Sequence, residues 1–412
     1  MDLPLNYNLP LTMHIDLNSC FAIIEQQANP LIRHKPVAVA AYDSPGGAVI
    51  ASSYEAKALG IKLGINVREA RLLSKDVIVM MPDPEKYFDA HRRFRKVLLN
   101  YTDEVTPKSV DEFIVDFRGS RAVQRGKSLT EIGLDIKQDI KQALGEYVTV
   151  NVGIATNRFL AKLAAGLHKP DGLDIITGEN LREIYGGLEL IDLPGINTRY
   201  RARLNVAGIY TPLQFLDTPL GVLRKQVFKS IVGLHWYLRL RGHEIDNVDF
   251  GRKSFGQQYA LGQKTSDIQE LSRLLMKLCE KTGRRLRGSG FIGGGIHLWL
   301  NFENRMYWSQ GHKLKKDVYS TQDIFLAAQR LLNTVAIPAR VTNMGVTVFN
   351  LHPANPEQLG LFDDSRLDTR SLARAADMVN DRYGEFTIVP AIMANMQDVI
   401  LKRVAFGNTG DN

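Results

Sequence analysis

Cysteine is scarce in this chain of 412 residues, which contains only Cys20 and Cys279. Two cysteines cannot build a disulfide framework or a zinc site made only of cysteine ligands, and a reducing cytoplasm is the expected location. Long apolar runs are also missing, because no stretch approaches the ~20 apolar residues that a membrane span requires. The N-terminal MDLPLNYNLP has no basic start followed by an apolar core, so we expect no secretory signal and no membrane partner.

The chain does have an ordinary globular composition and an excess of positive charge. Apolar residues make up 44% and charged residues 23%, and the length calls for two to four domains. The formal net charge is +8 and the pI is about 9.3. This charge favours a polyanionic partner, most simply a nucleic acid, although a merely basic soluble protein remains the alternative.

Hydrophobic periodicity predicts a mixed α/β core up to about residue 175. Residues 12–17 alternate, with Thr12, His14 and Asp16 on the side opposite the apolar residues, which predicts a strand. A helix should follow in NSCFAIIEQQANP, with Ser19 as its N-cap. Residues 148–155 again alternate as a strand, and NRFLAKLAAGLHKP reads as a helix that ends before Pro170.

The rest of the chain divides into a helical region and a second α/β region. LRKQVFKSIVGLHWYLRLRG predicts one amphipathic helix with Val227, Ile231, Leu234 and Leu238 on one face. A polar, glycine-containing stretch near residues 241–254 indicates a linker. SFGQQYAL, GGGIHLWLNF and NMGVTVFNL then predict strands around a helix in IQELSRLLMKLCEKTGRRL, and SLARAADMVNDRYG predicts a last helix.

Two adjacent acids, Asp111 and Glu112, precede an apolar run in KSVDEFIVDF. Clustered carboxylates suit Mg²⁺, and Asp16 at the end of the first strand supplies a third acid for two metal ions. Neighbours on an ideal strand point to opposite faces, so both acids can reach one metal pair only at a turn, which Pro107 favours. A solvated hairpin tip without metal is the alternative.

Five segments in order resemble the Y-family (translesion) DNA polymerases of the bacterial DinB and UmuC kind: MHIDLNSCFAIIE, ASSYEAKALGIKLG, KSVDEFIVDF, NVGIATNRFLAKLAAGLHKPDGL and IDLPGI. The resemblance implies an α+β multidomain fold. It places a ferredoxin-like palm over residues 11–30 and 82–175, fingers over 31–81, a thumb with a helix-hairpin-helix-like element over 176–243, a linker over 244–253, an α/β little finger over 254–351 and a C-terminal tail over 352–412.

The resemblance also implies roles for residues near the acids. Asp16, Asp111 and Glu112 match the family's catalytic metal-binding carboxylates, and Leu17 matches the residue that offers its backbone carbonyl to a metal. Phe21 matches the steric gate, whose ring excludes a 2′-hydroxyl by clash; a core aromatic is the alternative. The triphosphate-binding positions are Tyr54, Lys57 and Lys169. The alternative for Lys57 is a solvated helix charge, and the alternative for Lys169 is a cation at a helix C-terminus that faces the helix dipole.

Three positions depart from the family pattern. Asn18 stands where many relatives carry a second Asp, and we do not count it as a ligand. Cys20 replaces a residue that is often aromatic, and Ala51 stands where a hydroxyl residue often meets the triphosphate. Apart from these three, Lys57 stands where the family often has Arg; Lys keeps the positive charge but lacks the bidentate fork of Arg.

DNA and protein contacts follow from the same resemblance. Pro194 and Gly195 lie in a loop whose backbone N–H groups can bind a DNA phosphate. The candidate phosphate contacts of the little finger are Arg252, Lys253, Arg284, Arg285 and Arg287. EQLGLFDD resembles a sliding-clamp-binding peptide, in which Gln358 would bind the clamp groove and Leu359, Leu361 and Phe362 would fill an apolar pocket; packing against the little finger is the alternative.

We therefore expect a template-directed, low-fidelity translesion DNA polymerase without proofreading, active in DNA repair and the SOS response. Its cofactor would be two Mg²⁺ ions, and its partners would be primer–template DNA, dNTPs, the sliding clamp and possible accessory mutagenesis subunits. A catalytically silent DNA-binding scaffold of the same fold and a metal-dependent nuclease are the rival classes.

Overall fold

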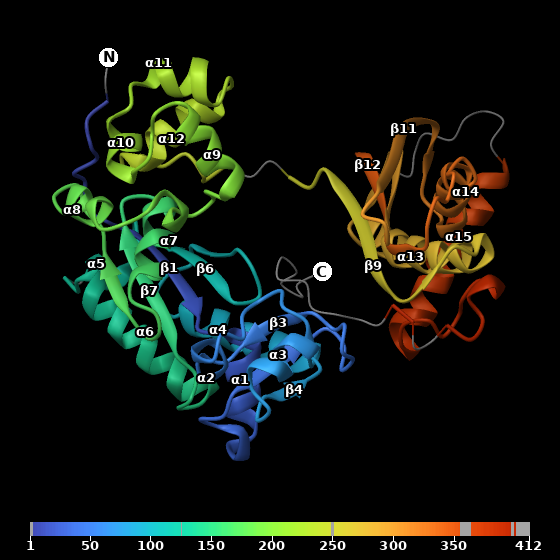
Figure 1. Cartoon of the computed structure of the whole chain (residues 1–412), viewed down its shortest axis with the longest axis horizontal. Coiled ribbons are helices and arrows are strands. Elements are labelled where there is room, and N and C mark those ends of the chain that lie inside the picture. The colour runs from blue at the N-terminus through green and yellow to red at the C-terminus, as the bar shows by residue number, and fades with distance from the viewer. Residues whose placement is uncertain (1–2, 125, 249–250, 355–363, 397–398, 401–412) are drawn as a thin grey trace. The chain divides into compact units, whose positions relative to one another are not determined.

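The computed structural model describes residues 3–124, 126–248, 251–354, 364–396 and 399–400 (Figure 1). Contacts divide the described residues into two units, which separate at Val248. The division falls within the stretch 244–253 that the sequence indicated as a linker. No helix in the described part of the chain is long and apolar enough to cross a membrane.

The first unit is built on a five-stranded sheet of order β5-β6-β1-β7-β8. The central strand β1 runs antiparallel to both of its neighbours, β6 and β7, whereas β7 and β8 are parallel. The strands are β1 (Thr12–Leu17), β5 (Val105–Pro107), β6 (Glu112–Asp116), β7 (Val150–Ala155) and β8 (Leu173–Ile175). The two alternating segments predicted as strands, 12–17 and 148–155, thus lie side by side.

The alternation of β1 divides the sheet into two faces. Met13 and Ile15 are fully buried and join a core that includes Phe113 and Phe94. His14 and Asp16 point to the opposite face, as expected for a period of two residues. Because Asp16 lies opposite Glu112 in the β1–β6 register, the face that carries His14 also carries both acids.

Helices cover both faces of this sheet. On the face of His14, α7 (Arg158–Leu167) lies so close to β7 that a Cβ at Gly153 would be 2.1 Å from the Ala161 carbonyl oxygen. On the other face, α6 packs closely, because a Cβ at Gly133 would be 2.8 Å from Leu173 Cδ1. Besides α7, the helices that accompany the five-stranded sheet are α1 (Cys20–Ala28), α4 (Pro84–Leu98), α5 (Arg121–Gln124) and α6 (Leu129–Leu144).

A smaller sheet of order β3-β2-β4 is inserted between β1 and α4, over the stretch assigned to the fingers. Its core is formed by small and β-branched residues such as Ala38, Val49 and Ala56. Its elements are η1 (Pro30–Ile32), β2 (Val37–Ala40), β3 (Val49–Ser52), α2 (Tyr54–Ala58), α3 (Val67–Leu73) and β4 (Ile78–Met80).

Residues 181–240 are helical, but one predicted helix is wrong. The segment 223–242 does not form one continuous helix: a π-helical turn over Leu223–Val227 ends near Lys229, whose φ is +49°, before α12 begins at Val232. The π-helical turn and the positive φ of Lys229 interrupt the helix, and the spacing of the apolar residues indicates neither of them. The elements are α8 (Leu181–Gly186), η2 (Leu190–Asp192), α9 (Thr198–Val206), α10 (Pro212–Asp217), α11 (Leu220–Val222), η3 (Leu223–Val227) and α12 (Val232–Leu240).

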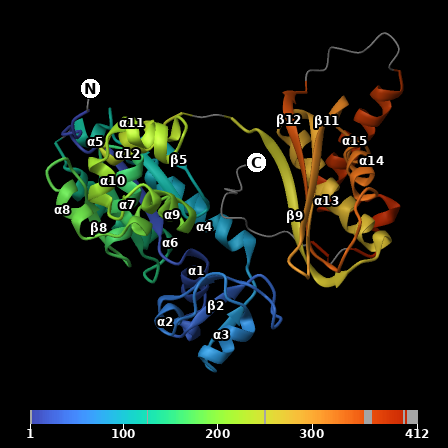
Figure 2. The ribbon, with the colours of Figure 1, turned by 45° about the horizontal axis from the view of Figure 1, so that its top comes forward.

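The second unit is an antiparallel sheet of order β11-β10-β12-β9, with α13 and α14 on one face (Figure 2). The three predicted strands and the helix between them are present. Strand β11 was not predicted, because YWSQGHKLKKDV is mostly exposed and polar, as is common for an edge strand. The elements are β9 (Ser254–Thr265), α13 (Ile268–Gly288), β10 (Phe291–Phe302), β11 (Tyr307–Val318), α14 (Thr321–Leu332) and β12 (Val341–Pro353).

Part of the expected C-terminal tail is folded onto this unit. In α15 (Asp364–Tyr383), Asp377 accepts hydrogen bonds from Arg287 at 2.6 and 2.8 Å. Beyond α15, the chain passes through η4 (Ala391–Met393), and Arg273 of α13 donates to the backbone oxygen of Ala394. Residues 364–396 and 399–400 therefore form an extra layer against α13 instead of a free extension.

Candidate active site

The two strands β1 and β6 bring Asp16 and Glu112 together. These residues are partners in the antiparallel register, so their side chains emerge on the same face. One step further along, the Leu17 backbone N–H donates to the Asp111 carbonyl at 2.9 Å. The fold thus places all three predicted acids at one end of the β1–β6 pair.

The adjacent acids sit at a turn, which removes the difficulty that strand geometry posed. Strand β6 begins at Glu112, and Asp111 belongs to the turn that connects it to β5. The Lys108 backbone N–H closes this turn on the Glu112 carbonyl at 2.9 Å. Asp111 accepts a short hydrogen bond from the Ser109 hydroxyl, which fixes its carboxylate at the start of the strand.

Two lysines neutralise the acids. Lys169 Nζ lies 2.7 Å from Asp16 Oδ1, and Lys162 Nζ lies 2.8 and 2.7 Å from the two oxygens of Glu112. The Asp16 and Glu112 side chains remain 15% and 20% exposed, so a small cation can still reach them. Lys162 was missed by the sequence analysis. Its signal is a single lysine within the apolar helix FLAKLAAG, whose neighbours pack on the sheet.

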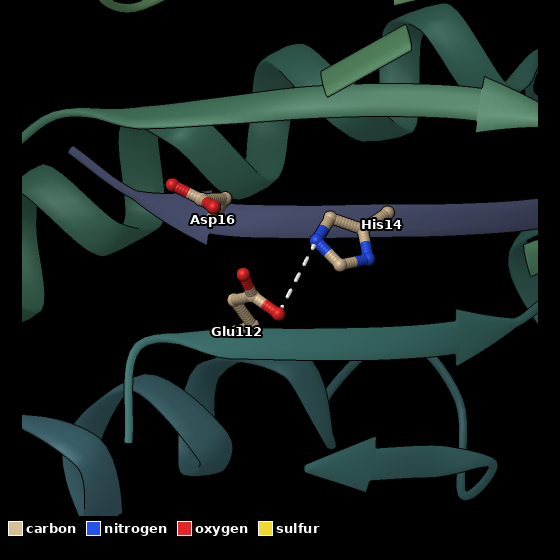
Figure 3. Close-up of side chains that lie close together, drawn as sticks. All are labelled: His14, Asp16 and Glu112. Atoms are coloured by element: carbon tan, nitrogen blue, oxygen red, sulfur yellow. Dashed lines mark ion pairs between the residues drawn. The ribbon is translucent and has the colours of Figure 1, made fainter. Parts of the chain in front are cut away.

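His14 is the second residue that was not predicted to be at the site. Figure 3 shows its ring directed toward Glu112, with Nε2 3.9 Å from Oε2. One ligand atom each from His14, Asp16 and Glu112 lie within 4.8 Å of one another. The alternation of residues 12–17 already put His14 on the side of Asp16. Asp111 does not belong to this closest group of described residues, and its role as a metal ligand stays a prediction.

Burial and the neighbouring charges shift the pKa values of the acids. Burial raises the pKa of Asp111 to about 6, opposed by the Ser109 hydrogen bond and reinforced by Asp16 and Glu112. Burial also raises the pKa of Asp16, against the attraction of Lys169. For Glu112, burial acts upward, but the hydrogen bonds and charge of Lys162 hold its pKa below the ordinary value. Burial lowers the pKa of His14 to about 3, so the ring is neutral near pH 7.

Replacing Asp111 by Asn should stabilise the metal-free protein near pH 8 by about 1–3 kcal/mol. Because the folded pKa of about 6 exceeds the ordinary 3.8, the stability that protonation gives is complete below pH 3.8 and is lost as the pH rises through 6. Asn carries no charge and escapes this loss. Urea unfolding across this pH range measures the difference. A stability difference between variant and wild type that does not grow with pH would contradict the raised pKa of Asp111.

Phe21 lies in the first turn of α1 and is fully buried. Its ring stacks on Tyr87, with centroids 4.3 Å apart and planes inclined by 13°. The Tyr87 hydroxyl donates to Glu25 at 2.8 Å, one helical turn after Phe21, and Lys86 pairs with the same carboxylate. In this structure Phe21 is therefore a core aromatic. Its action as a steric gate stays a prediction.

The predicted triphosphate-binding residues gather beside Asp16. Lys57 Nζ donates to the Ser19 hydroxyl at 2.7 Å and lies 4.5 Å from the centre of the Tyr54 ring. Burial, and then the charge of Lys169, lowers the pKa of Lys57. Ser19 occupies the N-cap position of α1 but makes no side-chain cap bond there, so its hydroxyl is used by Lys57 instead. The ammonium groups of Lys57 and Lys169 are thus close enough to repel one another.

The three departures from the family pattern have distinct surroundings. Asn18 is fully buried, donates to Asn151 at 2.8 Å and accepts from Thr149 and from the Asp171 backbone at 3.0 Å each. These bonds fit a structural role and not that of a ligand. Cys20 is buried in the core, which raises its thiol pKa, and Ala51 is half-buried in β3.

The predicted DNA-contacting residues are not equally available. Gly195 follows Pro194 with φ +88° in the loop before α9, a conformation that favours glycine. In the second unit, Arg252 lies 4.7 Å from the centre of the Phe255 ring, and Lys253 beside it is exposed. Arg285 is exposed and donates to the Gly256 carbonyl at 3.1 Å.

Arg284 and Arg287 are engaged within the protein. Arg284 lies 2.6 Å from Asp381, and the Arg287 side chain is only 4% exposed and paired with Asp377. Both were expected to contact phosphate; in this structure their guanidinium groups pair with acids of α15, and the phosphate contact stays a prediction. The clamp-binding residues Gln358, Leu359, Leu361 and Phe362 lie outside the described residues.

The donor set fits divalent metal. Asp16 and Glu112 present hard carboxylate oxygens from the adjacent strands β1 and β6. In this structure the ammonium groups of Lys162 and Lys169 supply the positive charge that these oxygens require. Carboxylates this close together repel one another and are stabilised by a cation between them. The site therefore has the ligands for divalent metal, with Asp111 beside it in the turn.

Comparison with known proteins places the chain in a family. Residues 15–166 match the impB/mucB/samB family, and residues 252–361 match its C-terminal domain. The chain is 32% identical over 394 residues to DNA polymerase IV of Pelotomaculum thermopropionicum, covering 94% of this chain and 96% of the relative. DNA polymerase IV of Moorella thermoacetica is also 32% identical, over 92% of this chain and 94% of the relative.

Solved structures agree with this comparison. A Y-family DNA polymerase chimera of Dbh and Dpo4 superposes with a TM-score of 0.72 and 26% identity, covering 82% of this chain and 98% of that one. An insertion ternary complex of Dbh DNA polymerase gives a TM-score of 0.56 with 25% identity, over 84% and 99% of the two chains. The chain thus belongs to the impB/mucB/samB family and has the fold of the Y-family DNA polymerases.

Proposed function

We propose that the protein is a translesion DNA polymerase that adds deoxynucleotides to a primer 3′-hydroxyl with two Mg²⁺ ions. The observation that carries the proposal is the convergence of Asp16, Asp111 and Glu112 from β1 and the β5–β6 turn, in a chain whose relatives are named DNA polymerase IV. Primer extension with Mg²⁺ and dNTPs on a primed template tests it.

The residues have separate tasks in this reaction. Asp16 and Glu112, with Asp111 and the Leu17 carbonyl, would hold the ions, which when bound lower the pKa of the attacking hydroxyl and neutralise charge on the leaving pyrophosphate. Lys57, Lys169 and Tyr54 would hold the triphosphate. Lys169 is paired with Asp16 in this structure, and it would turn from this carboxylate to the phosphates of the bound nucleotide.

Phe21 and the other contacts would define the substrate. Phe21 would lie under the sugar of the incoming nucleotide and exclude ribonucleotides. The loop at Pro194 and Gly195, together with Arg252, Lys253 and Arg285, would contact the phosphates of the duplex. Low fidelity is expected from the small inserted fingers, because a loose pocket cannot reject mispairs by shape.

The two rival functions predict different products. A silent scaffold gives no extension under any condition, although the intact acids argue against it. A nuclease that uses the same acids degrades the template and does not depend on dNTPs. Incubation of labelled primer–template with Mg²⁺, with and without dNTPs, separates the three functions in one experiment.

A double replacement of Leu361 and Phe362 by Ala should abolish stimulation by the sliding clamp but spare distributive synthesis. These apolar side chains are proposed to fill the clamp pocket, so their removal should weaken clamp binding at least ~10-fold. Clamp binding and primer extension with and without clamp are the measurements.

A matched control is available on α15. Leu372 and Met378 are exposed apolar residues of the same unit, 70% and 72% accessible. Their double replacement by Ala should leave clamp stimulation unchanged. Equal clamp binding by wild type and the Leu361/Phe362 variant would reject the assignment of the motif.

A further inference from the structure

His14 is a buried imidazole for which the polymerase mechanism provides no task. It lies in the middle of β1 and is 1% exposed. Neither ring nitrogen has a hydrogen-bond partner among the described residues. A buried polar group left without a partner costs roughly 1–3 kcal/mol, so a folded protein rarely keeps one without a ligand or a partner.

The ring lies beside two of the acids of the site. His14, Asp16 and Glu112 project from the same face of the β1–β6 pair, and Figure 3 shows the ring turned toward the Glu112 carboxylate. One ligand atom from each residue lies within 4.8 Å of the other two. A tetrahedral metal bound at about 2.1 Å holds its ligand atoms about 3.4 Å apart, so side-chain rotations that bring these atoms up to about 1.4 Å closer together complete the geometry.

We propose that His14, Asp16 and Glu112 bind Zn²⁺ in the protein that is free of DNA and nucleotide. One imidazole nitrogen and two carboxylate oxygens, with water in the fourth position, suit tetrahedral Zn²⁺. Mg²⁺ prefers oxygen ligands in an octahedral arrangement and gains little from the nitrogen. His14 therefore selects a transition metal at a site where the two acids alone would accept Mg²⁺.

The site has two consequences, only one of which depends on the proposed function. If Asp16 and Glu112 hold the catalytic ions of a polymerase, bound Zn²⁺ excludes them and inhibits synthesis. Zn²⁺ binding itself rests only on the three side chains.

The lysines compete with the metal for the same oxygens. Lys162 pairs with Glu112 and Lys169 with Asp16, so the ion must displace both ammonium groups. A positive charge this close also repels a dication. Replacing Lys162 by Met should therefore tighten Zn²⁺ binding several-fold.

The test uses the full chain without a histidine tag and without DNA. Co²⁺, a spectroscopic substitute for Zn²⁺, is titrated and followed by its d–d absorption, and Zn²⁺ is then added to displace it. We expect one equivalent with the intense bands of tetrahedral coordination, displaced by Zn²⁺ but not by ~100-fold more Mg²⁺.

His14→Phe should weaken Co²⁺ and Zn²⁺ binding at least ~10-fold, because it removes the nitrogen ligand. The change removes no hydrogen bond of the described structure. His168→Gln is the matched control, because His168 pairs with Asp174 at 2.7 Å and lies outside the proposed site. This variant should bind Co²⁺ and Zn²⁺ as wild type does. Equal affinity of wild type and His14→Phe would overturn the proposal.

A second measurement needs only the wild type, in case His14→Phe fails to fold. Proton NMR of the Co²⁺-loaded protein should contain one strongly shifted, exchangeable imidazole N–H signal. A spectrum without this signal, or Co²⁺ bands of six-coordinate oxygen ligation, would also overturn the proposal. Because none of these readouts involves DNA synthesis, a protein that binds Zn²⁺ but extends no primer disproves the polymerase function alone.

Discussion

Replacing Asp111 and Glu112 together by Ala should reduce primer extension at least ~1000-fold, a loss of about 4 kcal/mol of transition-state stabilisation. The reason is that Glu112 begins β6 opposite Asp16, and Asp111 lies in the turn directly before it. Single-turnover incorporation of one dNTP measures the effect, with DNA binding followed separately by fluorescence anisotropy.

The control is a carboxylate on α6, the helix that covers the opposite face of the sheet. Asp135 is exposed and pairs with Lys127 on the surface, so Asp135→Ala should extend primers as wild type does. We expect the double variant to retain DNA binding, because the basic contacts are untouched. Wild-type rates in the double variant would remove the three acids from the mechanism and leave the polymerase assignment without a metal site.

Phe21→Ala should lower discrimination against ribonucleotides by ~100-fold, equivalent to about 2.7 kcal/mol. Loss of the ring opens the space that a 2′-hydroxyl requires. The ratio of kcat/KM for a dNTP and the matching rNTP measures the effect. Unchanged sugar discrimination would assign Phe21 to the core alone, as its complete burial and its stacking on Tyr87 already suggest for the free protein.

Stability must be separated from specificity in this experiment. Removing a fully buried Phe costs about 3–5 kcal/mol, so the variant will unfold more easily whatever its role. Phe94 is the matched control, because it is equally buried in the same core and packs edge-to-face on Phe113 at 4.7 Å. Phe94→Ala should lose comparable stability and keep full sugar discrimination. If either variant does not fold, Leu replaces Ala at both positions.

Local sequence patterns predicted the elements that build the site. The alternation of residues 12–17 was sufficient to place β1 and to put His14 and Asp16 on one face. Pro107 correctly indicated the turn that lets Asp111 precede the strand while Glu112 begins it. These features depend on neighbours within a few residues, which is the range over which periodicity and turn chemistry act.

Features that depend on distant partners were not predictable in the same way. Lys162 resembles any helix lysine until α7 is packed over the sheet and its ammonium reaches Glu112, 50 positions away. Arg284 and Arg287 resemble phosphate contacts in sequence because nothing local reveals that α15 supplies their carboxylates. The break at Lys229 was not predicted, because a positive φ at a residue other than glycine cannot be recognised from the residue types around it.

The layer formed by α15 and the residues after it changes how deletion experiments on this chain should be designed. Ending the chain just after Phe362 would remove Asp377 and leave the guanidinium of Arg287 inside the protein without its counter-charge. It would also remove the backbone carbonyl that accepts from Lys277, a lysine that is only 1% exposed. A buried arginine without its counter-charge is strongly destabilising, so a shortened protein that aggregates would reveal nothing about clamp recruitment.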